Sequence, residues 1–93
     1  MTNATTTSHC SLCVLDVPEF DAIVRVLRAG GGVTVKRHGD YHIAEAANEI
    51  TLRRTDTGVG PAVWFGALTG GISGRIVEFS EDTLRLAPLT AAE

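Results

Sequence analysis

Three consecutive glycines, Gly30–Gly32, divide the chain into a helical segment and a segment of strands. Before the glycines, apolar residues recur at the spacing of one buried helix face: Phe20, Ile23, Val24 and Leu27. Asp16 is predicted to cap this helix, with Glu19 three residues later completing a capping box and Pro18 in the first turn. Because glycine takes a left-handed cap at low cost, the helix is predicted to end at the three glycines.

After the glycines, the pattern changes to the alternation that is typical of antiparallel strands. The predicted strands are residues 33–37, 41–46, 50–53, 62–68, 75–79 and 83–86. Gly39-Asp40 is predicted to form a two-residue hairpin turn, and the short connections favour a meander. Residues 12–15 form either an edge strand or the entry to the helix. The predicted fold is α+β, with one N-terminal helix followed by a five- or six-stranded antiparallel sheet, either open or curled into a small barrel.

The chain of 93 residues is long enough for one domain, which we place at residues 10–87, between a flexible leader (1–9) and a frayed tail (88–93). No stretch approaches the roughly 20 apolar residues that span a bilayer, so no membrane partner is expected. The N-terminus has neither the basic start nor the apolar centre of a signal peptide. We therefore expect a cytoplasmic protein whose thiols stay reduced.

The net charge of −3 and the dispersal of the eight basic residues argue against a nucleic-acid partner. Proteins that bind nucleic acid concentrate basic side chains, because neutralising phosphates dominates their affinity. The densest basic pair here is Arg53-Arg54, which is too little for such a surface.

A zinc site is one alternative for the function. Cys10 and Cys13 have C-x-x-C spacing, His38 and His42 have H-x-x-x-H spacing, and His9 is a spare nitrogen ligand. No cofactor other than this zinc ion is expected. If the cysteines are not ligands, Cys13 is a small buried residue and the histidines are solvated at a hairpin tip.

The predicted hairpin register opposes a complete zinc site. A turn at Gly39-Asp40 pairs His38 with Tyr41 and Arg37 with His42. Because side chains alternate along a strand, the two histidines then point to opposite faces of the hairpin. Arg37 and His42, on one face, are the candidate polar groups for another alternative, a small-ligand pocket inside a barrel.

Neither the glycines nor the hydroxyl groups form a catalytic motif, so an enzyme is not expected. The glycines near Gly70 lead into no helix, and no Gly-Lys-Ser/Thr follows them. No serine occupies a recognisable nucleophile turn.

The strand predicted at 62–68 is apolar on both faces, and this is the basis of the leading hypothesis. A helix of about 18 Å cannot cover both faces of a five-stranded sheet that is about 24 Å across. The uncovered face is expected to bind a protein partner or to form a homodimer, with Trp64, Leu68 and Ile76 at the interface. The predicted function is a non-catalytic protein-interaction module, such as a small subunit, adaptor or inhibitor. Otherwise Trp64 fills the core of a closed barrel.

Overall fold

The structure is a computed structural model that describes residues 9–89, and over this range it has one main helix and seven strands. It confirms the predicted α+β class and the antiparallel pairing of the strands. The elements follow in the order β2 (Cys10–Leu15), the 3-10 helix η1 (Pro18–Phe20), α1 (Asp21–Ala29), β3 (Val33–His38), β4 (Tyr41–Ala46), β5 (Ile50–Arg53), α2 (Arg54–Thr57), α3 (Pro61–Ala67), β6 (Ile72–Ser73), β7 (Arg75–Phe79) and β8 (Thr83–Ala87).

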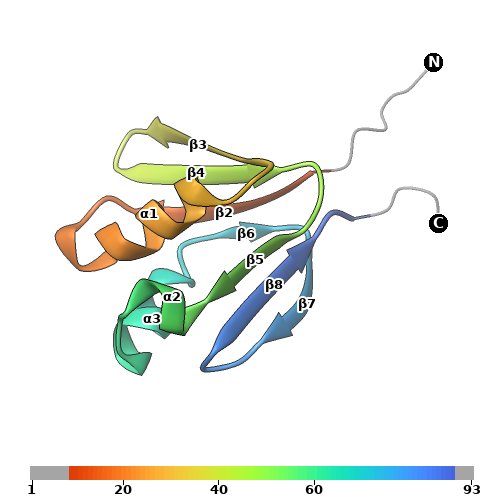
Figure 1. Cartoon of the computed structure of the whole chain (residues 1–93). Helices are drawn as coiled ribbons and strands as arrows, with labels where there is room; N and C mark the ends of the chain where they lie inside the picture. Colours follow the sequence, from red (N-terminus) through yellow and green to blue (C-terminus); the bar gives the residue numbers. More distant parts are fainter. Residues whose placement is uncertain (1–8, 90–93) are drawn as a thin grey trace, which may run out of the picture.

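The strands form two antiparallel sheets instead of the single sheet that the sequence predicts (Figure 1). The four-stranded sheet has the order β3-β4-β2-β6, and the three-stranded sheet has the order β5-β8-β7. The sheets are not closed into a barrel, so the barrel alternative is wrong. The predicted meander holds for the hairpins β3–β4 and β7–β8, whereas β2 and β5 pair with strands that are not their chain neighbours.

Gly74 carries the chain from one sheet to the other, because it separates β6 from β7. Its φ is +131°, in the region that favours glycine. A Cβ at this position would lie 2.7 Å from the carbonyl oxygen of Ala87 and 2.9 Å from the Cβ of Cys10. Any side chain here would therefore collide with a strand of each sheet.

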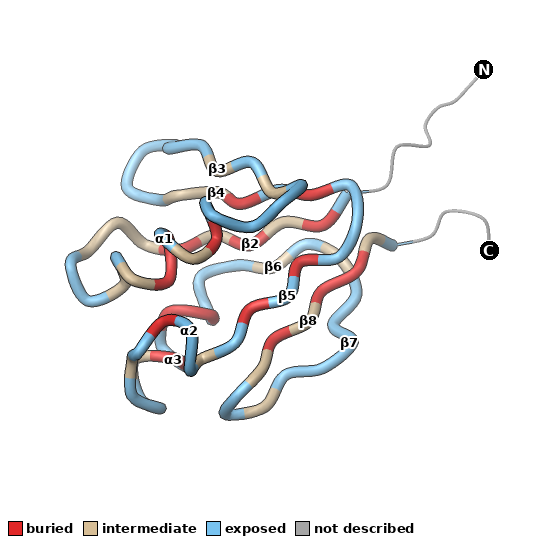
Figure 2. The backbone as a smooth tube through the Cα atoms, in the orientation of Figure 1, coloured by how far each residue is buried: buried red, intermediate tan, exposed pale blue. Residues whose placement is uncertain are grey.

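The hydrophobic core connects the two sheets with α1 and α3, as the buried segments in Figure 2 show. The predicted helix face is confirmed for Ile23, Val24 and Leu27, which are buried in α1, whereas Phe20 lies in η1 and is only partly buried. Burial alternates along β2, where Cys10, Leu12 and Val14 face the core, so residues 12–15 belong to a strand and not to the helix.

The predicted capping box is wrong, because Asp16 is used for a tertiary contact. The chain first forms the short η1, and α1 begins only at Asp21 with no side-chain cap. The Asp16 carboxylate instead contacts Nε2 of His42 at 3.0 Å and a guanidinium nitrogen of Arg37 at 2.8 Å. These contacts tie the start of the helical segment to the β3–β4 hairpin.

Residues 62–68, which the sequence predicts as a strand, form most of helix α3. Pro61 occupies the first helical turn, where its missing N–H costs nothing. Trp64 and Leu68 lie four positions apart on the buried helix face, and their side chains are 0% and 1% exposed. The indole N–H of Trp64 also donates a hydrogen bond to the Ser80 carbonyl oxygen at 2.8 Å. The prediction that these two residues form an exposed interface is therefore wrong, because the chain itself encloses them.

The predicted leader and tail lie largely outside the described residues. Only His9 of the leader and Pro88 and Leu89 of the tail are described. Within residues 9–89, no helix is both long enough and apolar enough to cross a membrane.

Candidate protein-interaction surface

β7 is an edge strand of the three-stranded sheet, and all five of its residues are exposed. Within the described residues it pairs with β8 alone, so its other edge has no neighbouring strand. Figure 2 shows β7 as a continuous exposed segment beside the mostly buried β8. An unpaired edge offers backbone N–H and C=O groups that another strand can bind.

A bulge at Val77 determines which way the side chains of β7 point. Ile76 lies opposite Leu86 and Phe79 lies opposite Leu84, while Val77 has no opposite residue. Cross-strand partners share a face of the sheet. Ile76 and Phe79 therefore lie on the same face as the core residues of β8. They stay exposed because, among the described residues, β8 is the one element that packs extensively against β7.

Helix α3 adds an aromatic side chain to this apolar face. The rings of Phe65 and Phe79 lie 5.5 Å apart between centroids, at an interplanar angle of 52°. The Trp64 hydrogen bond to Ser80 fixes α3 against the end of β7, which holds the two rings together. We define the β7 patch as four side chains that are between 37% and 49% exposed: Phe65, Ile76, Val77 and Phe79.

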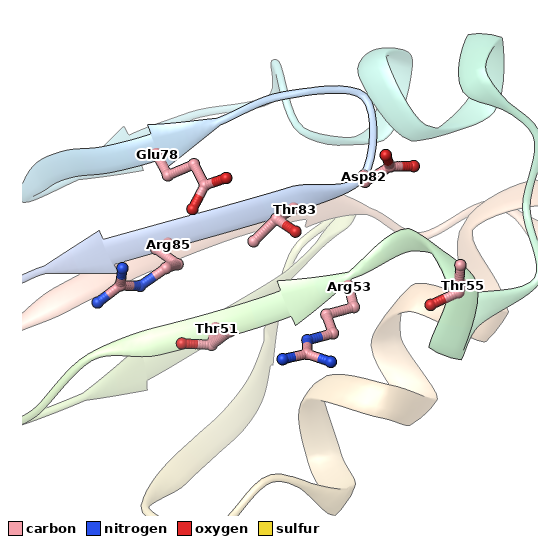
Figure 3. Close-up of a pocket in the computed structure, with 7 residues that line it drawn as sticks. All are labelled: Thr51, Arg53, Thr55, Glu78, Asp82, Thr83 and Arg85. Carbon is pink, nitrogen blue, oxygen red and sulfur yellow. The ribbon is translucent and has the colours of Figure 1, made fainter.

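The opposite face of the three-stranded sheet is polar. It contains an open hollow of about 520 Å³ whose lining residues are labelled in Figure 3: Thr51, Arg53, Thr55, Glu78, Asp82, Thr83 and Arg85. Ion pairs hold part of this surface, with Arg85 3.1 Å from Glu49 and Arg54 3.2 Å from Asp82. β7 therefore presents Ile76 and Phe79 on one face and the carboxylate of Glu78 on the other.

The structure divides the four predicted zinc ligands between the two sides of the four-stranded sheet. The register confirms the predicted hairpin, with Arg37 opposite His42 and His38 opposite Tyr41. Cys10 and His42 point to the core side of the four-stranded sheet, and Cys13 and His38 to its outer side. Among residues 9–89, no group of three or more His, Cys, Asp or Glu side chains is placed to hold a metal ion.

The environments of the two thiols differ. Cys10 is fully buried, and its Sγ lies 3.1 Å from the Asn48 carbonyl oxygen. Burial raises the pKa of the Cys10 thiol above its ordinary value, because the charged thiolate loses its solvation. Cys13 is half-buried and lines a hollow of about 260 Å³ with His38, Tyr41, Ile43 and Gly70.

Arg37 and His42 share a face, as predicted, but both are bound to Asp16. Only 12% of the His42 side chain is exposed, and its Nδ1 atom is buried without a hydrogen-bond partner. The two sheets enclose no barrel interior for these groups to line. The ion pair anchors the hairpin to the start of the helical segment. His42 lines an open hollow of about 380 Å³ beside α1 instead of a pocket inside a barrel.

Phe65, Val77 and Phe79 were not among the predicted interface residues, whereas Ile76 was. The exposure of Ile76 fits that prediction, although its role at an interface is a proposal. The helical spacing of Trp64, Ala67 and Leu68 is the signal that places Phe65 outside the core.

Comparison with known proteins supports the fold. No family model matches the chain, and no curated protein matches it in sequence. Among solved structures, it is similar to a regulatory protein in the structure of a phenol hydroxylase–regulatory protein complex. The TM-score is 0.72 at 8% sequence identity, and the match covers 85% of this chain and 97% of that chain. At this identity, the likeness shows a shared fold.

Proposed function

We propose that this chain is a non-catalytic regulatory subunit that binds a larger enzyme of the hydroxylase class through the β7 patch. The observation that carries the proposal is the exposed aromatic pair of Phe65 and Phe79 beside an unpaired strand edge. The similar fold in a hydroxylase–regulatory protein complex supports the class of partner. A cytoplasmic location belongs to the same proposal, since both cysteines are free thiols.

The composition of the β7 patch fits a binding surface. Apolar side chains of this size stabilise by about 1.5–3 kcal/mol when they pass from full exposure to full burial. The four members keep between 37% and 49% of their exposure, so covering all of them releases about 3 kcal/mol. Aromatic residues are also enriched where partners bury side chains most completely.

The side chains with the strongest potential for acid–base chemistry support a non-catalytic role. His42 is nearly buried, and its Nε2 is held by Asp16. Arg37 contacts the second oxygen of the same carboxylate at 2.8 Å. This arrangement orients the β3–β4 hairpin, and among residues 9–89 no nucleophilic side chain is hydrogen-bonded to the imidazole.

The test is titration of a purified hydroxylase from the same cells with this chain, following both binding and hydroxylase turnover. We expect the chain to form a complex with the hydroxylase. We also expect hydroxylase turnover to change until the binding sites are saturated. The double substitution F65A/F79A is expected to raise the dissociation constant by about 10- to 100-fold.

The control is Tyr41→Ala, because Tyr41 is 39% exposed but lies on the four-stranded sheet. It is expected to leave binding unchanged. Equal weakening by both variants would place the contact elsewhere, and the absence of binding to the hydroxylase would refute the proposed partner class.

A further inference from the structure

The edge of β7 carries two opposite charges that have no ion-pair partner within residues 9–89, Arg75 and Glu78. Glu78 lies directly opposite Arg85, but both carboxylate oxygens of Glu49 already accept from Arg85 at 3.1 and 3.3 Å. Glu78 therefore has an exposed carboxylate without an ion pair in residues 9–89, on a strand whose outer edge is unpaired in that range.

The Val77 bulge places these two charges on the same face of the sheet. Three positions apart in a regular strand, they would point in opposite directions. Here Arg75 lies opposite Ala87 and Glu78 lies opposite Arg85, and these two β8 residues are two positions apart. Arg75 and Glu78 therefore lie on one face of the sheet, while Ile76 and Phe79 lie on the other.

This pattern is complementary to a second copy of itself. From it we infer that two copies of the chain pair antiparallel through β7, about a twofold axis at Ile76. With Val77 left out of the new ladder in both copies, as it is against β8, Arg75 of each copy lies opposite Glu78 of the other, and Ile76 lies opposite Ile76 of the second copy. Phe79 is then diagonal to Ile76 of the second copy, within reach of an aromatic side chain.

The bulge makes this register selective. Moving the axis to lie between the two copies of Glu78 would place like charges opposite each other, which is destabilising. A partner strand without the same bulge could not place opposite charges against both Arg75 and Glu78 while its apolar side chains lie on the face of Ile76. The pairing joins the two three-stranded sheets into one sheet of six strands. The polar hollows lie on one side of it, and Ile76 and Phe79 of both copies lie on the other.

This inference goes beyond the proposed function, because it needs this chain alone. Binding to a hydroxylase and pairing with a second copy both use Ile76 and Phe79. A β7 strand that is paired with a second copy is therefore not available to a hydroxylase. A dimer without hydroxylase binding refutes only the proposed function, and a hydroxylase complex formed by a strict monomer refutes only the pairing.

The test is sedimentation equilibrium of the wild type and of charge variants over a concentration series. R75E and E78R each turn two attractive contacts of the dimer into repulsive ones, so each is expected to raise the dissociation constant by about 10- to 30-fold. The double variant R75E/E78R restores both pairs with the charges exchanged and is expected to dimerise like the wild type. Mixing the two single variants is expected to give a heterodimer, because both contacts are then between opposite charges.

Controls with the same charge changes are R53E, on the other edge strand β5, and E45R, on β4. Both are expected to dimerise like the wild type, and thermal melts of all variants report that the fold is kept. Three results would overturn the inference: a monomer at every concentration, a dimer that no β7 variant weakens, or a double variant that stays as weak as the single ones.

Discussion

Substitution of Trp64 by alanine tests whether this side chain belongs to the core, as the structure shows, and not to an exposed interface, as the sequence predicts. The side chain is fully buried, and its indole N–H donates to the Ser80 carbonyl at 2.8 Å. Truncating a buried Trp to Ala costs about 3–5 kcal/mol, since the apolar contacts are lost and a cavity remains. A domain of this size has about 5–14 kcal/mol of stability in total. We therefore expect W64A to lose a large part of the free energy of unfolding.

The assay is urea unfolding followed by circular dichroism. With a denaturant dependence of about 1–3 kcal/mol per molar urea, the loss corresponds to a midpoint about 2 M lower. W64F retains most of the apolar volume but not the hydrogen bond, so it is expected to lose less, with about 1 kcal/mol for the missing bond added to a smaller packing loss.

The matched control is Phe65→Ala, on the next residue of the same helix. Phe65 is half-exposed and contacts Phe79, so F65A is expected to cost about 0.5–1.5 kcal/mol for the aromatic pair. An unfolding midpoint of W64A equal to that of the wild type, with F65A more damaging, would refute the assignment of Trp64 to the core.

Two further predictions concern Gly74 and Cys10. In thermal melts, G74A is expected to destabilise the fold by about 2 kcal/mol or more, because the φ of +131° and the 2.7 Å approach to the Ala87 carbonyl leave no room for a methyl group. The control G66A lies in helix α3 with open space around it and is expected to stabilise the fold by up to about 1 kcal/mol. The raised pKa of Cys10 means that the folded state holds the thiol proton more tightly than the unfolded chain does, so stability is expected to fall as the pH rises above the ordinary value of 9.0. Urea unfolding at several pH values should show a shallower fall for C10A than for the wild type, and identical slopes would contradict this account of Cys10.

The β3–β4 hairpin was predictable from sequence because its information is local. Gly39 has a φ of +62°, which a two-residue turn requires, and the turn alone fixes the pairing of Arg37 with His42. The buried face of α1 was predictable for the same reason, since the spacing of Ile23, Val24 and Leu27 has a single helical interpretation.

The segment around Trp64 was not predictable from alternation alone. A short apolar run is compatible with a strand buried on both faces and with a buried helix, and the periodicity does not separate them. Pro61 at its start and the buried positions Trp64, Ala67 and Leu68 are the helical signals. This one assignment moved the expected interface from Trp64 and Leu68 to the β7 patch.

The pairing of strands that are distant in the chain was not predictable from the sequence either. The division into two sheets depends on β2 pairing with β4 and β6, and on β5 pairing with β8, none of which follows from short connections. Asp16 is a similar case, because a local cap and an ion pair with the hairpin compete for one carboxylate. The tertiary contact is the one that forms.

Hydrogen exchange of the backbone amides tests the central claim that the β7 patch is the binding surface. The chain is compared free, at a dilution where it is monomeric, and bound to the hydroxylase. We predict slower exchange in β7 and at the start of the β7–β8 turn, with no change at the tip of the β3–β4 hairpin around Gly39. Slower exchange in that hairpin, with β7 unchanged, would contradict the account.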